Sequence, residues 1–97
     1  MNTGIPKQFQ LAGHTIKVKI IPHARWPHKK DTIGVFDPST YEIHINSRTR
    51  GTNRQQTFTH ELVHALLIIG GHGDISDNED FVDRMGHLLH QAMTTFA

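Results

Sequence analysis

The chain contains no cysteine among its 97 residues. This absence excludes disulfide bonds, thiolate ligands for a metal ion and a cysteine nucleophile. Any metal site must therefore be built from histidine, aspartate and glutamate side chains. The nine histidines supply enough ligands for such a site, but they also raise the odds that two of them fall close together by chance.

Long hydrophobic runs and a surplus of charge of one sign are missing as well. The longest unbroken apolar run, from Ala65 to Ile69, is far too short to cross a bilayer. The formal net charge of +1 gives no sign of a protein that neutralises many phosphates. The first residues, MNTGIPKQFQL, lack the charged-then-apolar layout of a signal peptide. We therefore expect a cytoplasmic protein with no membrane or nucleic-acid partner.

The remaining composition is that of an ordinary globular domain. Hydrophobic residues make up 36% of the chain and charged residues 20%. A chain of this length can bury one modest core, so we predict a single domain over residues 1–97.

The N-terminal half has the pattern of strands. In residues 8–21, Ile16, Val18 and Ile20 alternate with lysines, and an Ala-Gly pair before them could turn a short hairpin. Residues 22–32 contain two prolines and no periodicity, so we expect a solvated loop whose tryptophan is pinned into the core. Residues 33–36 and 41–46 are predicted to form a β-hairpin, because an Asp-Pro pair opens the turn between them. We expect the strand 41–46 to present an open edge.

Two helices are predicted after the strands. Residues 52–69 begin with a capping-box pattern at Thr52 and end before two glycines, and this apolar helix should be central and buried. Residues 70–76 are expected to form a polar loop, after which a second capping box from Ser76 to Glu79 would open a helix to about Phe96. The predicted core-facing residues of this last helix are Phe81, Met85, Leu88, Leu89, Ala92 and Phe96. This order predicts an α+β fold, with a small antiparallel or mixed sheet packed against both helices.

The first predicted helix carries the stretch "FTHELVHALL", in which His60 and His64 are four residues apart and Glu61 follows the first histidine. Residues i and i+4 lie on one helix face, so both imidazoles can reach one tetrahedral ion. Glu61 projects about 100° round from His60, close enough to reach a metal-bound water without being a ligand. The alternative is a pair of hydrogen-bonded histidines on a half-buried face. Burial in so apolar a helix is costly without a partner, which favours a divalent cation.

A catalytic zinc site usually takes a third protein ligand, and three downstream residues are candidates. Glu79 is on the first turn of the last helix, although as a capping residue it could instead reach back to Ser76. Asp83 lies four residues later on the same side of that helix. His72, eight residues after His64, is the weaker candidate because no glycine stands midway to turn the chain toward the ion.

The pattern His60-Glu61-x-x-His64 followed by Glu79-x-x-x-Asp83 resembles that of the gluzincins, zinc peptidases whose third ligand is a glutamate on a second helix. The stretches "GVFDPSTYEIHIN", "QTFTHELVHALL" and "EDFVDRMGHLL" resemble the hairpin, the active-site helix and the next helix of the small ImmA/IrrE-like metallopeptidases. The likeness covers roughly residues 33–90, and in the last helix only Glu79 matches a ligand outright.

This resemblance implies a minimal zincin-like fold and a peptidase that uses Zn²⁺. It implies His60, His64 and Glu79 as zinc ligands and Glu61 as the general base. It also implies that Asp83 is an outer carboxylate that holds a ligand imidazole in the right tautomer. The partner would be a protein or peptide substrate, with a transcriptional repressor as one candidate. The cleavage preference, the regulation and the oligomeric state stay open.

Other classes of protein are set against this interpretation. Peptide deformylases share the H-E-x-x-H motif but use a cysteine ligand, and YbeY-type RNA-processing enzymes use three histidines with a different spacing. A zinc-dependent RNA-processing hydrolase, a non-catalytic zinc-stabilised interaction module and a metal-free histidine-rich binding domain are the alternatives. Glu61 favours an enzyme, because a structural site has no use for a base. The candidates for stabilising an oxyanion are Tyr41, His72, His87 and His90.

Overall fold

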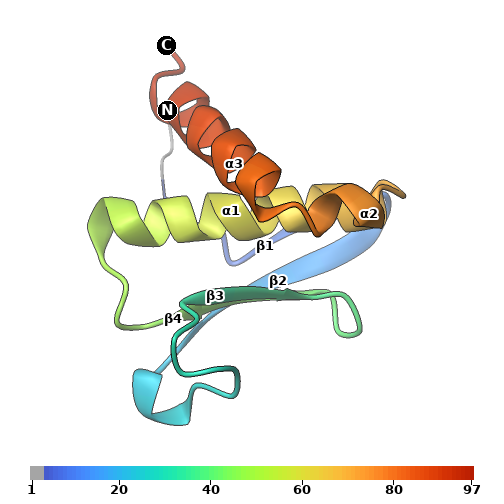
Figure 1. Cartoon of the computed structure of the whole chain (residues 1–97). Helices are drawn as coiled ribbons and strands as arrows, with labels where there is room; N and C mark the ends of the chain where they lie inside the picture. The colour runs from blue at the N-terminus through green and yellow to red at the C-terminus, as the bar shows by residue number, and fades with distance from the viewer. Residues whose placement is uncertain (1–3) are drawn as a thin grey trace.

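A four-stranded sheet forms one layer of the molecule, and the long helix α1 lies across one face of it (Figure 1). The computed structural model describes residues 4–97. Helix α3 packs on the side of α1 that faces away from the sheet (Figure 1). The strands are β1 (Gln8–Leu11), β2 (His14–Ile21), β3 (Gly34–Asp37) and β4 (Glu42–Asn46), and the helices are η1 (His23–Arg25), α1 (Gly51–Ile69), α2 (Gly73–Ser76) and α3 (Glu79–Thr94). The predicted α+β class is confirmed.

The sheet is mixed, with the strand order β1-β2-β4-β3. Strands β1 and β2 form the predicted hairpin, whose turn residues Ala12 and Gly13 both have positive φ, 51° and 81°. Strands β3 and β4 form the second antiparallel hairpin, and β2 runs parallel to β4. Because β4 lies between β2 and β3, the expectation that strand 41–46 presents an open edge is wrong. Among residues 4–97, the edge strands of the sheet are β1 and β3.

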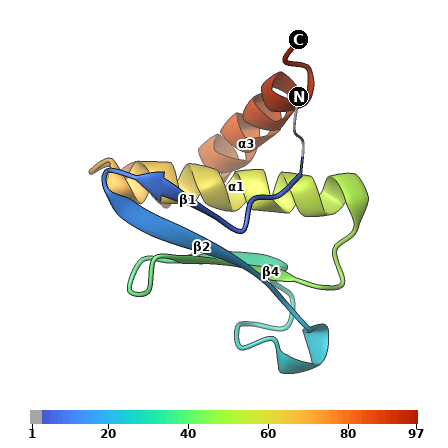
Figure 2. The same cartoon turned by 180° about the vertical axis from the view of Figure 1, so that it is seen from behind.

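The core lies between the sheet and α1. The buried residues of the main cluster alternate along the strands and meet two residues of the helix; they are Ile16, Phe36, Ile43, Ile45, Phe58 and Ala65. The alternation predicted for β2 is wrong at Ile20, which is exposed. In the view from behind, β1 runs alongside α1 and β2 crosses below it (Figure 2). The rings of Phe9 and Phe58 meet edge to face, 6.0 Å apart, and this contact joins β1 to the helix.

Helix α1 begins differently from the prediction and ends as predicted. Its N-cap residue is Arg50, which makes no side-chain capping bond, so the predicted capping box at Thr52 is wrong. The guanidinium of Arg54 instead donates from Nη2 to the carbonyl oxygens of Ser47 and Thr49, at 2.8 and 2.6 Å. These bonds hold the preceding turn against the helix. The helix ends at Gly70, and among residues 4–97 no helix is long and apolar enough to cross a membrane.

The segment between the two long helices is more ordered than the predicted polar loop. It contains the short helix α2, and α3 begins at Glu79 with Asn78 as its N-cap, whose Oδ1 accepts a hydrogen bond from the Phe81 N–H at 3.1 Å. The predicted capping role of Ser76 is therefore wrong, because Asn78 is the residue that satisfies the helix start. Ser76 is buried instead.

Helix α3 is rotated relative to the predicted core-facing stripe. Val82 and Gly86 are its buried residues, whereas Phe81, Leu88 and Phe96 are exposed. A Cβ at Gly86 would lie 3.3 Å from the Cα of His60, tighter than ordinary van der Waals contact. The glycine side of α3 therefore faces α1, because only this side lets the two helix backbones approach so closely.

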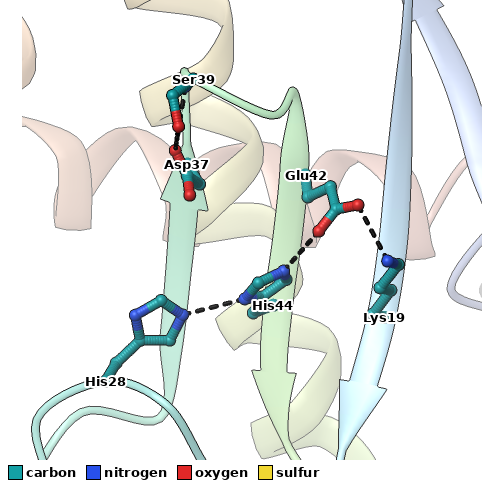
Figure 3. Close-up of polar contacts among 6 residues, drawn as sticks. All are labelled: Lys19, His28, Asp37, Ser39, Glu42 and His44. Atoms are coloured by element: carbon teal, nitrogen blue, oxygen red, sulfur yellow. Dashed lines mark hydrogen bonds and ion pairs between the residues drawn. The ribbon is translucent and has the colours of Figure 1, made fainter.

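The loop before β3 folds over the sheet face opposite α1, where a chain of polar contacts anchors it (Figure 3). His28 Nε2 lies 2.9 Å from His44 Nδ1, and His44 Nε2 lies 2.7 Å from Glu42 Oε1. Lys19 completes the chain with an ion pair to Glu42 at 2.8 Å. The indole of Trp26 donates to the Lys29 carbonyl oxygen at 3.1 Å, so the tryptophan holds the loop together rather than entering the core as expected.

Candidate metal centre

Two histidines of α1 and one glutamate of α3 converge at the contact between the helices. His60 and His64 are one turn apart, and their Nε2 atoms lie 3.2 and 3.4 Å from Glu79 Oε1. One ligand atom from each residue lies within 4.8 Å of the others, so the group could hold a metal ion. The structure therefore brings together the three residues predicted as ligands, and they are the only such group among residues 4–97.

The backbone explains why Glu79 faces the histidines. The close packing of Gly86 on His60 brings the start of α3 over the histidine-bearing turn of α1. Asn78 caps the helix, so the Glu79 carboxylate is not occupied as a capping group. The Glu79 side chain is 68% exposed, against 26% for His60 and 14% for His64. The group is thus buried on the helix side and open to solvent on the glutamate side, which leaves access for a water molecule or a substrate.

Ser76 is a member of the site that the sequence interpretation missed. Its Oγ lies 2.7 Å from His64 Nδ1, and the serine itself is 6% exposed. With Nδ1 engaged in this hydrogen bond, the Nε2 atom of His64 is left to point at the Glu79 carboxylate. No local signal identifies this role, because a serine just before a helix is most simply interpreted as a cap.

The other predicted neighbours of the site lie at different distances from it. Asp83 Oδ1 is 3.7 Å from both His60 Nδ1 and His87 Nε2, at ion-pair range but beyond a hydrogen bond. The alternative ligand His72 caps α2 and does not belong to the convergent group. Of the four candidates for stabilising an oxyanion, only His87 lines the groove beside the site.

Glu61 is buried directly next to the ligands. Its residue is 7% exposed, and burial, reinforced by the nearby Glu79 carboxylate, raises the pKa of Glu61 to about 7. A hydrogen bond from the Phe36 backbone N–H opposes this rise. Gly34 makes room for the side chain, because a Cβ there would lie 2.6 Å from Thr57 Cγ2 and 3.1 Å from Glu61 Cγ. The absence of a side chain at Gly34 of β3 thus leaves the space that the Glu61 side chain of α1 occupies.

Burial also lowers the pKa of His64, and the neighbouring His60 acts in the same direction. Glu79 opposes this effect. The balance favours the neutral imidazole, which is the form that binds a metal ion.

A groove of about 670 Å³ runs past the site. Its walls are β3 with the residues before it, the side of α1 that carries His60, Glu61 and His64, and residues of the segment from Ser76 to His87. The backbone of β3 contributes to this wall. Asn46 N–H donates to the Ile33 carbonyl oxygen, so in the antiparallel alternation the next residues, Gly34 and Phe36, direct their N–H and C=O groups away from β4.

Comparison of the chain with models of known protein families, with curated proteins and with solved structures finds no match.

Proposed function

We propose that the protein is a zinc-dependent peptidase in which Glu61 is the general base. The observation that carries the proposal is the position of this buried carboxylate, next to the convergent group His60, His64 and Glu79 and at the wall of a groove. Two imidazoles and one carboxylate are a common ligand set for catalytic zinc, which keeps a further position open. Because Glu79 is exposed, a water molecule or a substrate could reach this further position from the solvent.

A bound zinc ion would supply Lewis-acid polarisation of the attacking water and of the peptide carbonyl. Glu61 would accept the proton of the water as its oxygen attacks the carbonyl carbon, and would then deliver the proton to the leaving amine. In the zinc-free protein the pKa of Glu61 is about 7. A bound dication would lower this pKa, so the carboxylate form that accepts the proton would be present near neutral pH. Ser76 would keep His64 oriented throughout.

The free edge of the sheet at β3 also supports a peptide as the substrate. The edge strand β3 borders the groove and directs the N–H and C=O groups of Gly34 and the C=O of Phe36 outward. An extended peptide could pair with these groups as an added strand, with its backbone held beside Glu61. The N–H of Phe36 is already committed to Glu61, so the strand positions the base and the substrate together.

The test is the variant Glu61→Gln, which keeps the size of the side chain but cannot accept the proton. We expect it to stay folded and retain stoichiometric zinc, and to lose roughly 10²–10⁴-fold in the rate of peptide hydrolysis. Zinc is measured by elemental analysis and hydrolysis with quenched fluorescent peptides. Equal cleavage by the wild type and Glu61→Gln would overturn the proposal, and cleavage of RNA instead would favour an RNA-processing hydrolase.

A second candidate function is a non-catalytic, zinc-stabilised interaction module. One observation favours it: the ligands come from two helices, His60 and His64 from α1 and Glu79 from α3, so an ion would join two elements of a small domain. Such an ion could be structural alone. A zinc-loaded wild-type protein that hydrolyses no peptide or protein, and that unfolds when its zinc is removed, would support this candidate.

A further inference from the structure

Among residues 4–97, the side chains that line the groove include carboxylates but no lysine or arginine. Besides Glu61 and Glu79, the groove carries Asp31 on the sheet side and Asp77 and Asp83 on the helix side. One bound dication set against these five carboxylates leaves a formal charge of −3 when Glu61 is ionised and −2 when it is protonated, with the lining histidines neutral. A groove of this sign attracts positively charged ligands.

Lysine and arginine side chains are fewest near the helix end of the groove, which is the end formed by α2 and the start of α3. Nine of the ten lysines and arginines lie in residues 1–54, and some of them surround the sheet end: Lys30 precedes Asp31, and Arg48 Nη2 donates to the Lys30 carbonyl oxygen at 3.2 Å. Residues 55–97 contain six of the nine acidic residues but only one cation, Arg84, which does not line the groove. The charge preference should therefore be set near α2 and the start of α3.

At this end an apolar side chain and a carboxylate line the groove together. Ile68, near the end of α1, is half-buried, and Asp77, directly after α2, is exposed. Ser76, the residue before Asp77, also lines the groove, but its hydroxyl is engaged with His64. Lysine and arginine have the matching chemistry, since each carries an apolar stem that can lie on a residue such as Ile68 and a cationic head that can reach a carboxylate.

We propose that the groove end formed by Ile68 and Asp77 binds a lysine or arginine side chain of a peptide substrate. The inference rests on the proposed peptidase function, because it takes the peptide to lie in the groove along β3. It adds the substrate class: peptides with a basic residue to one side of the bond that is cleaved. Because Asp77 is exposed, the preference is moderate and is weakened by salt.

The experiment uses the zinc-loaded full chain and quenched fluorescent octapeptides of alanine and leucine. One position at a time carries lysine, norleucine or glutamate, where norleucine keeps the stem of lysine without its charge. We expect one position at which lysine exceeds norleucine in kcat/KM by about 1.5- to 5-fold at low salt, with glutamate below both. About 0.5 M salt should reduce the ratio of lysine to norleucine toward one.

Two variants locate the effect. Asp77→Asn should bring the ratio of lysine to norleucine close to one, and Asp77→Lys should reverse the order of lysine and glutamate. Asp80→Asn is the matched control, since it removes the same charge from the neighbouring first turn of α3 but does not line the groove. It should keep the ratio of the wild type. Equal losses in Asp77→Asn and Asp80→Asn would overturn the subsite.

The failure of this inference can be told apart from the failure of the proposed function. Cleavage with no preference at any position would overturn the subsite and leave the peptidase. If no peptide is cleaved, binding of the same peptides to the zinc-loaded protein is measured by fluorescence anisotropy. A lysine preference that Asp77→Asn removes would then support the subsite without the peptidase, and equal binding of all three peptides would overturn it.

Discussion

The hydroxyl oxygen of Ser76 lies 2.7 Å from Nδ1 of His64, although the two residues belong to different helices. This contact joins the short helix α2 to the imidazole of His64, a member of the candidate metal site. A buried hydrogen bond at Nδ1 selects both the rotation and the tautomer of the imidazole, which sets how well Nε2 can bind an ion.

Replacing Ser76 with alanine is expected to weaken zinc binding by about 10- to 100-fold, because the His64 ring loses the group that orients it. Zinc affinity is measured by competition with a chromophoric chelator. The control is Ser39→Ala, which removes a hydroxyl that donates to Asp37 on an exposed turn and does not line the groove. Unchanged affinity in Ser76→Ala would show that α2 contributes nothing to the orientation of His64.

Gly34→Ala is expected to lower peptidase activity by about tenfold or more while zinc content is kept. The added Cβ meets Thr57 and Glu61, so either β3 or the Glu61 carboxylate must shift, and small misplacements of a catalytic group are costly. The unfolding free energy should fall by about 1–3 kcal/mol. Gly73→Ala is the control, since a Cβ there meets nothing within 4 Å. Full activity in Gly34→Ala would mean that the strand does not set the position of the base.

In zinc-free protein, Glu61 should make stability fall as pH rises from about 4.5 to about 7. The pKa of the carboxyl is raised from 4.5 to about 7 by folding, so in this window the folded chain holds a proton that the unfolded chain has released. The effect is on the order of 3 kcal/mol and is complete above pH 7. Denaturant titrations across this range compare the wild type with Glu61→Gln, and their difference isolates Glu61 from the histidines. A difference that does not change with pH would contradict the raised pKa.

Removal of zinc should lower the melting temperature of the wild type. At a free zinc concentration of 100 times the dissociation constant, binding stabilises the fold by roughly 2.7 kcal/mol, or about 10–20 °C for a domain of this size. His60→Ala and Glu79→Gln should melt at one temperature with and without chelator, whereas the control His72→Ala should behave as the wild type, because His72 is outside the ligand group. Superimposable wild-type curves after verified metal removal would show that the fold does not depend on the ion.

The loop over the outer face of the sheet should loosen in acid. Burial and the neighbouring His44 lower the pKa of His28, while Asp37 acts in the opposite direction. The contribution of His28 to stability is therefore present above its ordinary pKa of 6.5 and is lost as pH falls through the lowered value. The single tryptophan, Trp26, contacts the His28 ring and reports the change by fluorescence. In His28→Gln the fluorescence should lose this acid transition; an identical transition in both proteins would contradict the assignment.

The strands and the first long helix could be predicted because their patterns are local. Ile43 and Ile45 alternate with polar residues and are buried, and the two glycines after Ile69 end α1 where expected. The predicted group of His60, His64 and Glu79 could also be placed, since an i, i+4 pair shares a helix face whatever the tertiary structure.

The features that depend on distant contacts could not be predicted from local patterns. Ser76 and Asn78 both suit a helix start, and only the packing of α2 against α1 decides that one of them faces His64. The rotation of α3 depends on the contact of Gly86 with His60, and hydrophobicity alone favoured Phe81 and Leu88. The parallel pairing of β2 with β4, which makes β3 an edge strand, likewise joins segments far apart in the chain.

An edge strand that can accept a peptide can also accept another copy of itself, and β3 is built in a way that opposes such self-pairing. The strand is only four residues long, which limits the ladder that a second copy could form. It begins with Gly34, a weak strand former, ends at the charged Asp37 and is followed at once by Pro38, which has no N–H to donate. Crowding by α1 further restricts access to the Phe36 N–H, which already bonds Glu61. The shortness of β3 therefore disfavours pairing of two copies through the same backbone groups that face the groove.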